Sequence, residues 1–373
     1  MINEQRLTEE FLELVKVDSE TKYEREIADV LKEKFENLGV RVKEDDTTHI
    51  TGHGAGNLIC TLEGTSDADP IYFTSHMDTV VPGNGVNPVI EDGYIKTDGT
   101  TILGADDKAG LAAMLEAVRV IKENNIAHPT VQFIITVGEE SGLIGAKALS
   151  RDDLIAKYGF ALDSDGKVGT VIVAAPTQAK IAATVHGKTA HAGVAPEKGI
   201  SAITIAAKAI ANMPLGRIDE ETTANIGRIE GGSQTNIVTD RVEILAEARS
   251  LVPEKMEEQA GAMKQALEEA AKVMGGRADV NIEVIYPGFK HKDGDHVVEV
   301  AKKAIGAVGR EAVLKTSGGG SDANVIAGHG IPTINLGIGY EEIHTTNEKM
   351  PVEELVKTAE LVTEIIRNAA ESE

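Results

Sequence analysis

Histidine and carboxylate side chains recur in this sequence where strand-like apolar runs give way to loops. The clusters are His76 with Asp78, Asp106 with Asp107, Glu139 with Glu140, Asp163 with Asp165, and His344. One such cluster would mean little, since polar residues are usual in loops. Five clusters of the same residue types, all expected at one edge of a sheet, favour a single site.

The residue types in these clusters suit a dinuclear metal site. Imidazole and carboxylate groups are good ligands for Zn²⁺, Mn²⁺ and Co²⁺. Two such ions about 3.5–4 Å apart lower the pKa of a bridging water toward about 7. A free carboxylate beside that water can take its proton and pass it to a leaving amine. The pair Glu139 and Glu140 offers one ligand and one base, and Asp78 offers a partner for His76.

Helix-like and strand-like segments alternate through the first half of the chain. The expected strands are 40–46, 57–64, 71–78, 130–140 and 159–166, and the expected helices are 9–17, 24–39, 104–125 and 142–149. This alternation predicts an α/β fold with helices on both faces of a sheet. Sites in such folds form outside the carboxyl ends of the strands, where the polar clusters are expected.

From about Pro176 the order of elements changes to β-α-β-β-α-β. The segments are strand 179–190, helix 200–213, strands 223–232 and 240–251, helix 253–275 and strand 279–288. This is the order of a ferredoxin-like unit. We therefore expect a catalytic domain of residues 1–175 and 289–373, interrupted by an inserted domain of residues 176–288. Two domains also suit a chain of 373 residues.

Composition excludes several classes of protein. The net charge of −23 disfavours binding to nucleic acid or to anionic membrane surfaces. The longest apolar runs have the length of a strand, and the N-terminal segment lacks the pattern of a signal peptide. The single cysteine, Cys60, allows no intramolecular disulfide. We expect a cytoplasmic protein without nucleic-acid or membrane partners.

The polar clusters lie within motifs that resemble those of the dinuclear-zinc peptidases and deacylases. That family includes peptidase T, the glutamate carboxypeptidases, aminoacylase and acetylornithine deacetylase. The motifs are SHMDTV (75–80), LGADDKAG (103–110), GEESGLIGAK (138–147), ALDSDG (161–166) and IHTTNE (343–348). GADDKAG is most similar to the peptidase T branch. The resemblance implies a zinc-binding α/β domain with a mixed sheet and an inserted ferredoxin-like lid.

The resemblance also implies a set of ligands for two divalent ions, zinc in the first place and cobalt or manganese as alternatives. The implied ligands are Asp106 as the bridge, His76 and Asp163 for one ion, and Glu140 and His344 for the other. Because ALDSDG contains two aspartates, Asp165 is the alternative to Asp163. Asp163 is preferred since it directly ends the strand.

Catalytic roles follow from the same resemblance. Glu139 would be the general base, and Asp78 would accept a hydrogen bond from the imidazole nitrogen of His76 that does not touch metal. The peptide bond between Asp106 and Asp107 would be cis. His191, in HGKTAHAG (186–193), would stabilise the oxyanion, often from a neighbouring subunit through a lid–lid homodimer.

Substrate contacts are implied at two further places. Asn236 and Arg249 would bind a carboxylate or the backbone of a short peptide substrate. The Gly-rich segment SGGGSDAN (317–324) resembles the family's substrate loop, and its residues Ser317, Gly318 and Gly319 could point backbone N–H groups at ligand oxygens.

The predicted function is hydrolysis of peptide bonds in short peptides by a peptidase T-like aminopeptidase or tripeptidase. A deacylase of N-acyl amino acids or a carboxypeptidase remains open, because GEESG also occurs in those branches. A metal-dependent peptide binder without turnover is less consistent with an intact Glu139, since a binder needs no base.

Overall fold

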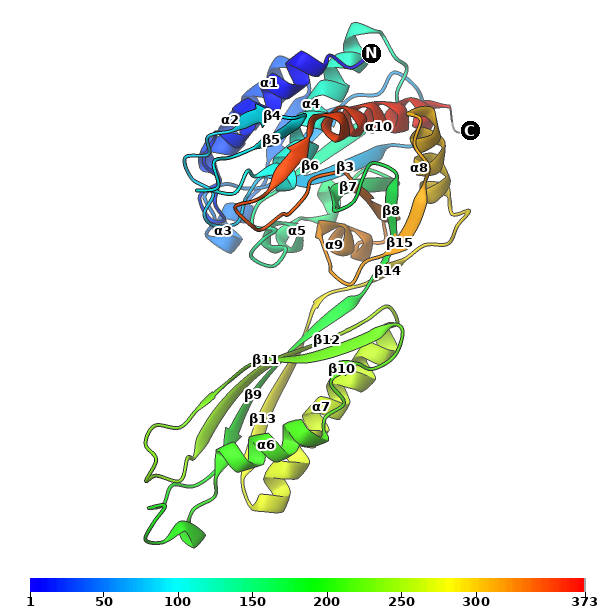
Figure 1. Cartoon of the computed structure of the whole chain (residues 1–373). Coiled ribbons are helices and arrows are strands. Elements are labelled where there is room, and N and C mark those ends of the chain that lie inside the picture. The colour runs from blue at the N-terminus through cyan, green and yellow to red at the C-terminus, as the bar shows by residue number, and fades with distance from the viewer. Residues whose placement is uncertain (372–373) are drawn as a thin grey trace. The chain divides into compact units, whose positions relative to one another are not determined.

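The computed structural model describes residues 1–371, and these form two compact units (Figure 1). Unit 1 comprises residues 1–174, 291–316 and the described chain from 321 onward, and unit 2 comprises 175–290 and 317–320. The expected domain boundaries lie within two residues of these limits. Residues 317–320, which were expected in the catalytic domain, group with unit 2 for a reason given with Arg249 below.

The core of unit 1 is a mixed sheet with the strand order β1-β2-β6-β3-β7-β16-β8, and β15 also pairs with β8. The strands are β1 (Arg41–Glu44), β2 (Leu58–Leu62), β3 (Ile71–His76), β6 (Val131–Thr136), β7 (Tyr158–Ser164), β8 (Thr170–Ala175), β15 (Val313–Thr316) and β16 (Thr333–Gly337). Strand β3 runs parallel to β6 and β7, and β16 runs parallel to β7. The carboxyl ends of these four strands therefore point the same way. The predicted α/β fold with a mixed sheet is confirmed.

Aromatic packing joins the three central strands. The Phe73 ring lies between Phe133 and Phe160, with ring centroids 6.0 and 5.5 Å apart. All three rings are fully buried, and they sit at equivalent positions of β3, β6 and β7. Offset aromatic pairs at these distances add to the stabilisation from burial alone. The rings thus fix the register of the strands whose ends carry the polar clusters.

Helices cover this sheet, as Figure 1 shows. They are α1 (Glu4–Val15), α2 (Arg25–Asn37), α3 (Thr47–Thr51), α4 (Ala105–Glu123), α5 (Ile144–Ala148), α8 (His296–Ala307), α9 (Asp322–Gly328) and α10 (Val352–Ala370), with a 3₁₀ turn at Arg151–Asp153. Helix α4 is buried almost throughout, packs against α1 and α10, and lies along β3. A small sheet of β4 (Val89–Glu91), β5 (Tyr94–Lys96) and β17 (Lys349–Pro351) was not expected from the sequence. No helix within residues 1–371 is long and apolar enough to cross a membrane.

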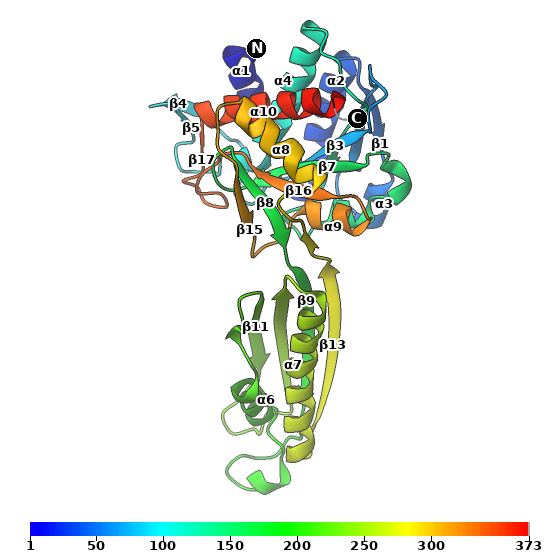
Figure 2. The same ribbon diagram turned by 90° about the vertical axis from the view of Figure 1, so that its right-hand side faces the viewer.

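Unit 2 has the expected β-α-β-β-α-β order (Figure 2). Its elements are β9 (Thr177–His186), a 3₁₀ turn at Pro196–Lys198, α6 (Ala202–Asn212), β10 (Gly216–Arg217), β11 (Thr222–Gly231), β12 (Arg241–Ser250), α7 (Pro253–Met274), β13 (Arg277–Tyr286) and the short β14 (Phe289–Lys290). The antiparallel sheet has the order β10-β11-β12-β9-β13. Alternate residues of β9, such as Ile181 and Val185, are buried with α6 and α7, because side chains alternate across a strand.

Candidate metal centre and active site

Strand direction brings most of the predicted ligands to one edge of the unit 1 sheet. His76 is the last residue of β3, Glu139 and Glu140 follow β6, and Asp163 lies near the end of β7. His344 lies in the loop after β16. Since these strands are parallel neighbours, their carboxyl ends meet.

Asp106 and Asp107 reach the same place by a different route. They were expected among the strand-end clusters and also within a helix at 104–125, and the structure places them after a loop, at the start of helix α4. Their backbone angles are non-helical, and the peptide bond between them is cis, as the resemblance implied. The position of these two aspartates is therefore set by the start of a helix and not by the end of a strand.

The two oxygens of Asp106 face different imidazoles. Oδ1 of Asp106 lies 3.0 Å from Nε2 of His76, and Oδ2 lies 3.2 Å from Nε2 of His344. Glu140 Oε1 lies 2.8 Å from the same His344 nitrogen, and Asp163 Oδ1 lies 3.9 Å from the His76 nitrogen. One carboxylate thus stands between two groups of predicted ligands, each with one histidine and one further acid.

The electrostatics of the cluster fit bound cations. Burial and the charge of Asp106 raise the pKa of Asp163 well above its ordinary value. Burial and the charge of Asp163 do the same to the pKa of Glu139. Hydrogen bonds to Asp106 and Glu140 raise the pKa of His344 to about 10. The raised pKa values show that the negative charges of the acids in this cluster are not balanced by nearby positive groups. Divalent ions would supply the missing positive charge.

The donor atoms are also grouped as a metal needs them. Ligand atoms of His76, Asp106 and Glu140 all lie within 4.8 Å of one another, and those of His76, Asp107 and Asp163 do so as well. Imidazole and carboxylate donors in such groups suit Zn²⁺, Co²⁺ or Mn²⁺. Asp107 was not among the predicted ligands, and its Oδ2 accepts a hydrogen bond from the Ser75 hydroxyl.

The structure distinguishes between the two aspartates of ALDSDG. Asp163 belongs to the cluster, and the Tyr340 hydroxyl donates to its Oδ1 at 3.2 Å. Its backbone is held by Asn335, which exchanges hydrogen bonds of 3.0 and 2.6 Å with the N–H and C=O groups. Asp165 lies exposed in the turn that follows β7.

His76 is oriented mainly by a backbone carbonyl. Its Nδ1 lies 2.9 Å from the main-chain oxygen of Asp78 and 3.5 Å from the Asp78 carboxylate. The expected hydrogen bond to the carboxylate is therefore replaced by a shorter one to the carbonyl. Because a carbonyl only accepts, Nδ1 carries the hydrogen and leaves Nε2 directed at Asp106.

The Asp78 carboxylate instead organises the loop that carries the glutamates. Its Oδ1 accepts the backbone N–H of Glu139 at 2.9 Å, and its Oδ2 accepts that of Glu140 at 3.3 Å. The Thr21 hydroxyl donates to Oδ2 at 2.7 Å. Asp78 is fully buried, so these bonds are shielded from water. One aspartate thus positions the imidazole of His76 and both glutamates.

Gly138, immediately before Glu139, gives a prediction about this loop. Its φ of +59° favours glycine, and an added Cβ would overlap Cε1 of His53. We expect Gly138→Ala to lower the free energy of unfolding by about 2–4 kcal/mol, from backbone strain together with overpacking. The matched control is Gly142→Ala, which has φ +108° but an open position for Cβ. Chemical denaturation that shows equal losses for the two variants would contradict a role for His53.

Two buried acids beside the cluster were missed by reasoning from the sequence. Glu348 is 1% exposed and accepts three backbone N–H groups around Asp106. Asp322 opens helix α9, accepts a hydrogen bond from Thr136, and has its pKa raised by burial to about 6. Both lie inside quoted motifs, IHTTNE and SGGGSDAN, but nothing in the sequence shows that their side chains turn inward.

In unit 2, His191 and Asn236 lie next to each other. The segments that carry them form a bridge at His191 and Ile237, and the Ala192 N–H donates to the Asn236 carbonyl at 2.9 Å. The Gly193 N–H donates to Nδ1 of His191 at 3.2 Å. Since Nδ1 accepts, the neutral ring carries its hydrogen on Nε2 and can donate from there.

Arg249 is joined to the Gly-rich segment. Its Nη1 donates to the Gly318 carbonyl at 3.1 Å, while Nε and Nη2 bind Glu247 at 3.0 and 3.1 Å. Gly320 packs so closely on Tyr286 that a Cβ would overlap the ring. These contacts explain why 317–320 belongs to unit 2. Most of the five donors of Arg249 are engaged, so a substrate carboxylate would compete with Glu247.

The structure separates these two groups within one chain. The loop with His191 follows the end of the sheet where His186 pairs with Arg241, and Asn236 precedes the same end. Arg249 lies at the other end of β12, and eight residues of strand span about 27 Å. His191 and Asn236 of one unit 2 therefore do not share a site with Arg249 and residues 317–319 of that same unit.

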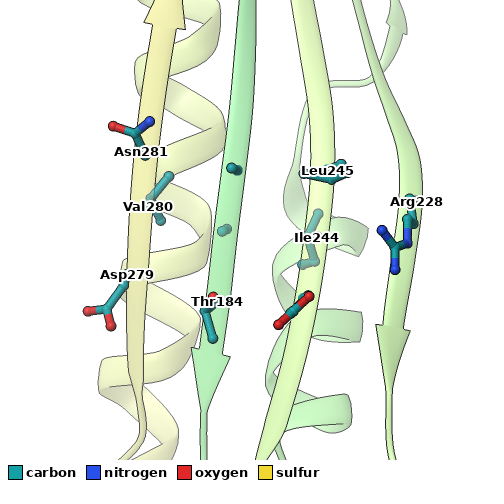
Figure 3. Close-up of a pocket in the computed structure, with 10 residues that line it drawn as sticks. Thr184, Arg228, Ile244, Leu245, Asp279, Val280 and Asn281 are labelled. Carbon is teal, nitrogen blue, oxygen red and sulfur yellow. The ribbon is translucent and has the colours of Figure 1, made fainter.

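A pocket of about 550 Å³ lies over the middle of the unit 2 sheet (Figure 3). The side chains of Arg228, Asp279 and Asn281 surround it, and helices lie behind the sheet in this view. None of the predicted site residues lines this pocket.

An α/β domain that gathers two histidines and several buried acids around one shared aspartate defines a metal-dependent hydrolase. The chain belongs to the Peptidase family M20/M25/M40, whose family model matches residues 72–368. The predicted family of metallopeptidases is therefore confirmed, and the protein is a hydrolase of that family.

Similar proteins cover the whole chain. A Bacillus subtilis (strain 168) protein, "Uncharacterized protein YqjE", is 76% identical over 99% of this chain and 100% of its own. A structure described as aminopeptidase PepT from Bacillus cereus ATCC 10987 is 72% identical, with a TM-score of 0.96 and 99% of each chain covered. A structure described as a tripeptidase from Staphylococcus aureus subsp. aureus mu50 is 54% identical, with a TM-score of 0.97 and 100% of each chain covered.

Proposed function

We propose that this protein is a dinuclear-metal aminopeptidase that releases the N-terminal residue from short peptides, tripeptides first among them. The observation that carries the proposal is the position of Asp106 between His76 and His344, with Glu139 in the adjoining loop. The similar structures described as an aminopeptidase and a tripeptidase support the substrate class.

The proposed ligands of the two ions are those that the resemblance implied. Asp106 would serve both ions, His76 and Asp163 would hold one, and Glu140 and His344 would hold the other, with zinc as the first choice of metal. When bound, such ions supply Lewis acidity, which polarises the scissile carbonyl and eases deprotonation of a water molecule. Asp78 keeps His76 and both glutamates in place, as its hydrogen bonds indicate.

The proposed base is Glu139. Burial and the charge of Asp163 raise the pKa of Glu139, and a base with a raised pKa is better suited to accept a proton near neutral pH. Glu139 would take the proton from water and deliver it to the leaving amine. The Asp78 carboxylate accepts the backbone N–H of Glu139 at 2.9 Å, and this hydrogen bond restrains the backbone from which the Glu139 side chain extends.

We further propose that unit 2 is a lid and dimerisation domain and that His191 acts on the site of a second copy. The separation of His191 from Arg249 supports this, because one chain alone does not bring them together. Nε2 of His191 would donate to the carbonyl oxygen as negative charge develops there. A cytoplasmic location stays a prediction from the sequence.

The homodimer gives a complementation test. We expect His191→Ala alone to lower kcat by about 10²–10³-fold, the usual cost of losing one oxyanion donor. We expect Glu139→Ala to be inactive as well. When the two variants are mixed, unfolded and refolded together at equal amounts, about one quarter of the wild-type rate should return, since half of the dimers contain one intact site of two. Each variant refolded alone is the control, and no recovery in the mixture would place His191 in the site of its own chain.

A substrate panel tests the function itself. Di- and tripeptides with free N-termini, the same peptides N-acetylated, and N-acetyl amino acids would be assayed with added Zn²⁺, Co²⁺ or Mn²⁺. Release of the first residue from free peptides alone supports an aminopeptidase. Hydrolysis of N-acetyl amino acids, or release of the C-terminal residue, would instead favour the deacylase or the carboxypeptidase.

A further inference from the structure

The Glu348 carboxylate binds the backbone of the turn that contains Asp106. Its Oε2 accepts the N–H groups of Leu103 and Gly104, both at 2.7 Å, and its Oε1 accepts the N–H of Asp106 at 3.0 Å. The side chain is 1% exposed. Short bonds to a carboxylate in a place without water are stronger than bonds between neutral groups, so this turn is firmly fixed.

The same loop that ends in Glu348 also carries His344. The backbones of Glu341 and Lys349 exchange hydrogen bonds of 2.9 and 3.0 Å, which close the loop. Inside it, the Glu348 N–H donates to the Thr345 carbonyl at 3.1 Å. The spatial separation of His344 and Glu348 is therefore fixed by a compact, hydrogen-bonded turn.

These contacts connect two segments that are more than 240 residues apart. The Glu348 carboxylate binds the backbone of Asp106. The Glu348 backbone is part of the hydrogen-bonded loop that carries His344. The side chains of Asp106 and His344 then meet at 3.2 Å. A shift of either segment would alter this distance, and metal sites tolerate changes of only a few tenths of an ångström.

We propose that Glu348 is a positioning residue that sets Asp106 against His344 before metal binds. It touches neither substrate nor the reacting atoms and acts through the two ligands. Without its carboxylate, the ion held by Glu140 and His344 would be affected most, because both its shared aspartate and its histidine would lose their fixed positions. The ion held by His76 and Asp163 would lose only the fixed position of Asp106. The proposal rests on the proposed dinuclear site.

Glu348→Gln in the full-length protein tests it. Glutamine keeps the size, but only one of its two head-group atoms accepts, so an NH₂ group faces either Asp106 or the Leu103–Gly104 pair. We expect one ion to bind nearly as in the wild type and the other to bind about 10–100-fold more weakly. Metal content after dialysis, Zn²⁺ competition titration and the visible spectrum of the Co²⁺-loaded protein would measure this.

Two further variants separate positioning from a general loss of stability. Glu348→Asp keeps both oxygens on a shorter chain and should recover part of the lost affinity. Glu342→Gln removes an exposed carboxylate from the same loop and should bind both ions like the wild type. Melting of the metal-free proteins gives the structural contribution, and we expect Glu348→Gln to lower the melting temperature by only a few degrees, because a buried NH₂ group would face backbone donors.

Two results would overturn the proposal. One is wild-type affinity for both ions and an unchanged cobalt spectrum in Glu348→Gln. The other is a large drop in the melting temperature of the metal-free Glu348→Gln protein, combined with no recovery of metal affinity in Glu348→Asp. That result would mean that Glu348 only stabilises the fold. If the wild type itself binds fewer than two ions, the proposed function fails and the variants are not needed to show it.

Discussion

Glu139→Ala is expected to lower kcat by on the order of 10²–10⁴-fold while both metal ions stay bound. The reason is the different position of the two neighbouring glutamates. Glu140 Oε1 lies 2.8 Å from Nε2 of His344 and so belongs with the ligands. Glu139 is absent from both groups of close ligand atoms in residues 1–371; His344 is absent too, but it contacts Asp106 and Glu140 directly. Its loss should therefore remove proton transfer and leave the metal site in place.

Glu139→Gln and Glu140→Ala are the informative companions. Glutamine keeps the volume of Glu139 but takes up no proton, so kcat should fall as far as in Glu139→Ala. Glu140→Ala should lose metal, because it removes one of the two side chains, Glu140 and His344, that are proposed to hold the same ion. Single-turnover rates and metal content, measured on the same preparations, separate the two effects. A normal kcat in Glu139→Gln with both ions present would show that another group is the base.

Removal of the metal is expected to abolish hydrolysis and to lower stability, and Zn²⁺, Co²⁺ or Mn²⁺ should restore both. Without cations, burial and mutual repulsion raise the pKa of Asp163 and Glu139 well above the ordinary value. Bound ions would compensate this repulsion, and binding to the folded state alone stabilises it. Full activity after verified removal of metal would refute the mechanism.

The stability of the metal-free protein should also depend on pH in a definite direction. Asp163, Glu139 and His344 all have folded pKa values above their unfolded ones. Through these three groups the folded state binds more protons than the unfolded state. The free energy of unfolding therefore falls as pH rises. The fall begins above the ordinary carboxyl pKa of about 4 and continues toward the pKa of His344, about 10. Asp106 and Asp78, whose pKa values are lowered, are already ionised in both states there and add no slope. Melting curves of chelated protein from pH 5 to 8, beside metal-loaded controls, test this; a melting temperature that rises with pH would contradict it.

Much of the fold could be predicted because it depends on local pattern. Near-continuous apolar runs such as 131–137 are typical of strands buried on both faces, and the structure has β6 there. The β-α-β-β-α-β order of unit 2 follows from periodicity that changes between two and 3.6 residues. Helix α3 and the β4–β5 hairpin were missed, since short elements with mixed exposure have weak patterns.

The sequence by itself determined which residue types are available and which clusters belong together. Through the resemblance to the metallopeptidase family, it led to His76, Asp106, Glu140, Asp163 and His344 as the predicted ligands. It also led, through the resemblance, to the cis bond between Asp106 and Asp107 that the structure contains.

Only the tertiary structure decided where each polar atom points. It directed the Asp78 carboxylate to the backbone of the glutamates and gave His76 a carbonyl instead. It turned Glu348 inward onto a segment more than 240 residues away, and it set His191 and Arg249 at opposite ends of one sheet. Such contacts depend on side-chain direction and on pairing between distant segments, and local pattern carries no information about either.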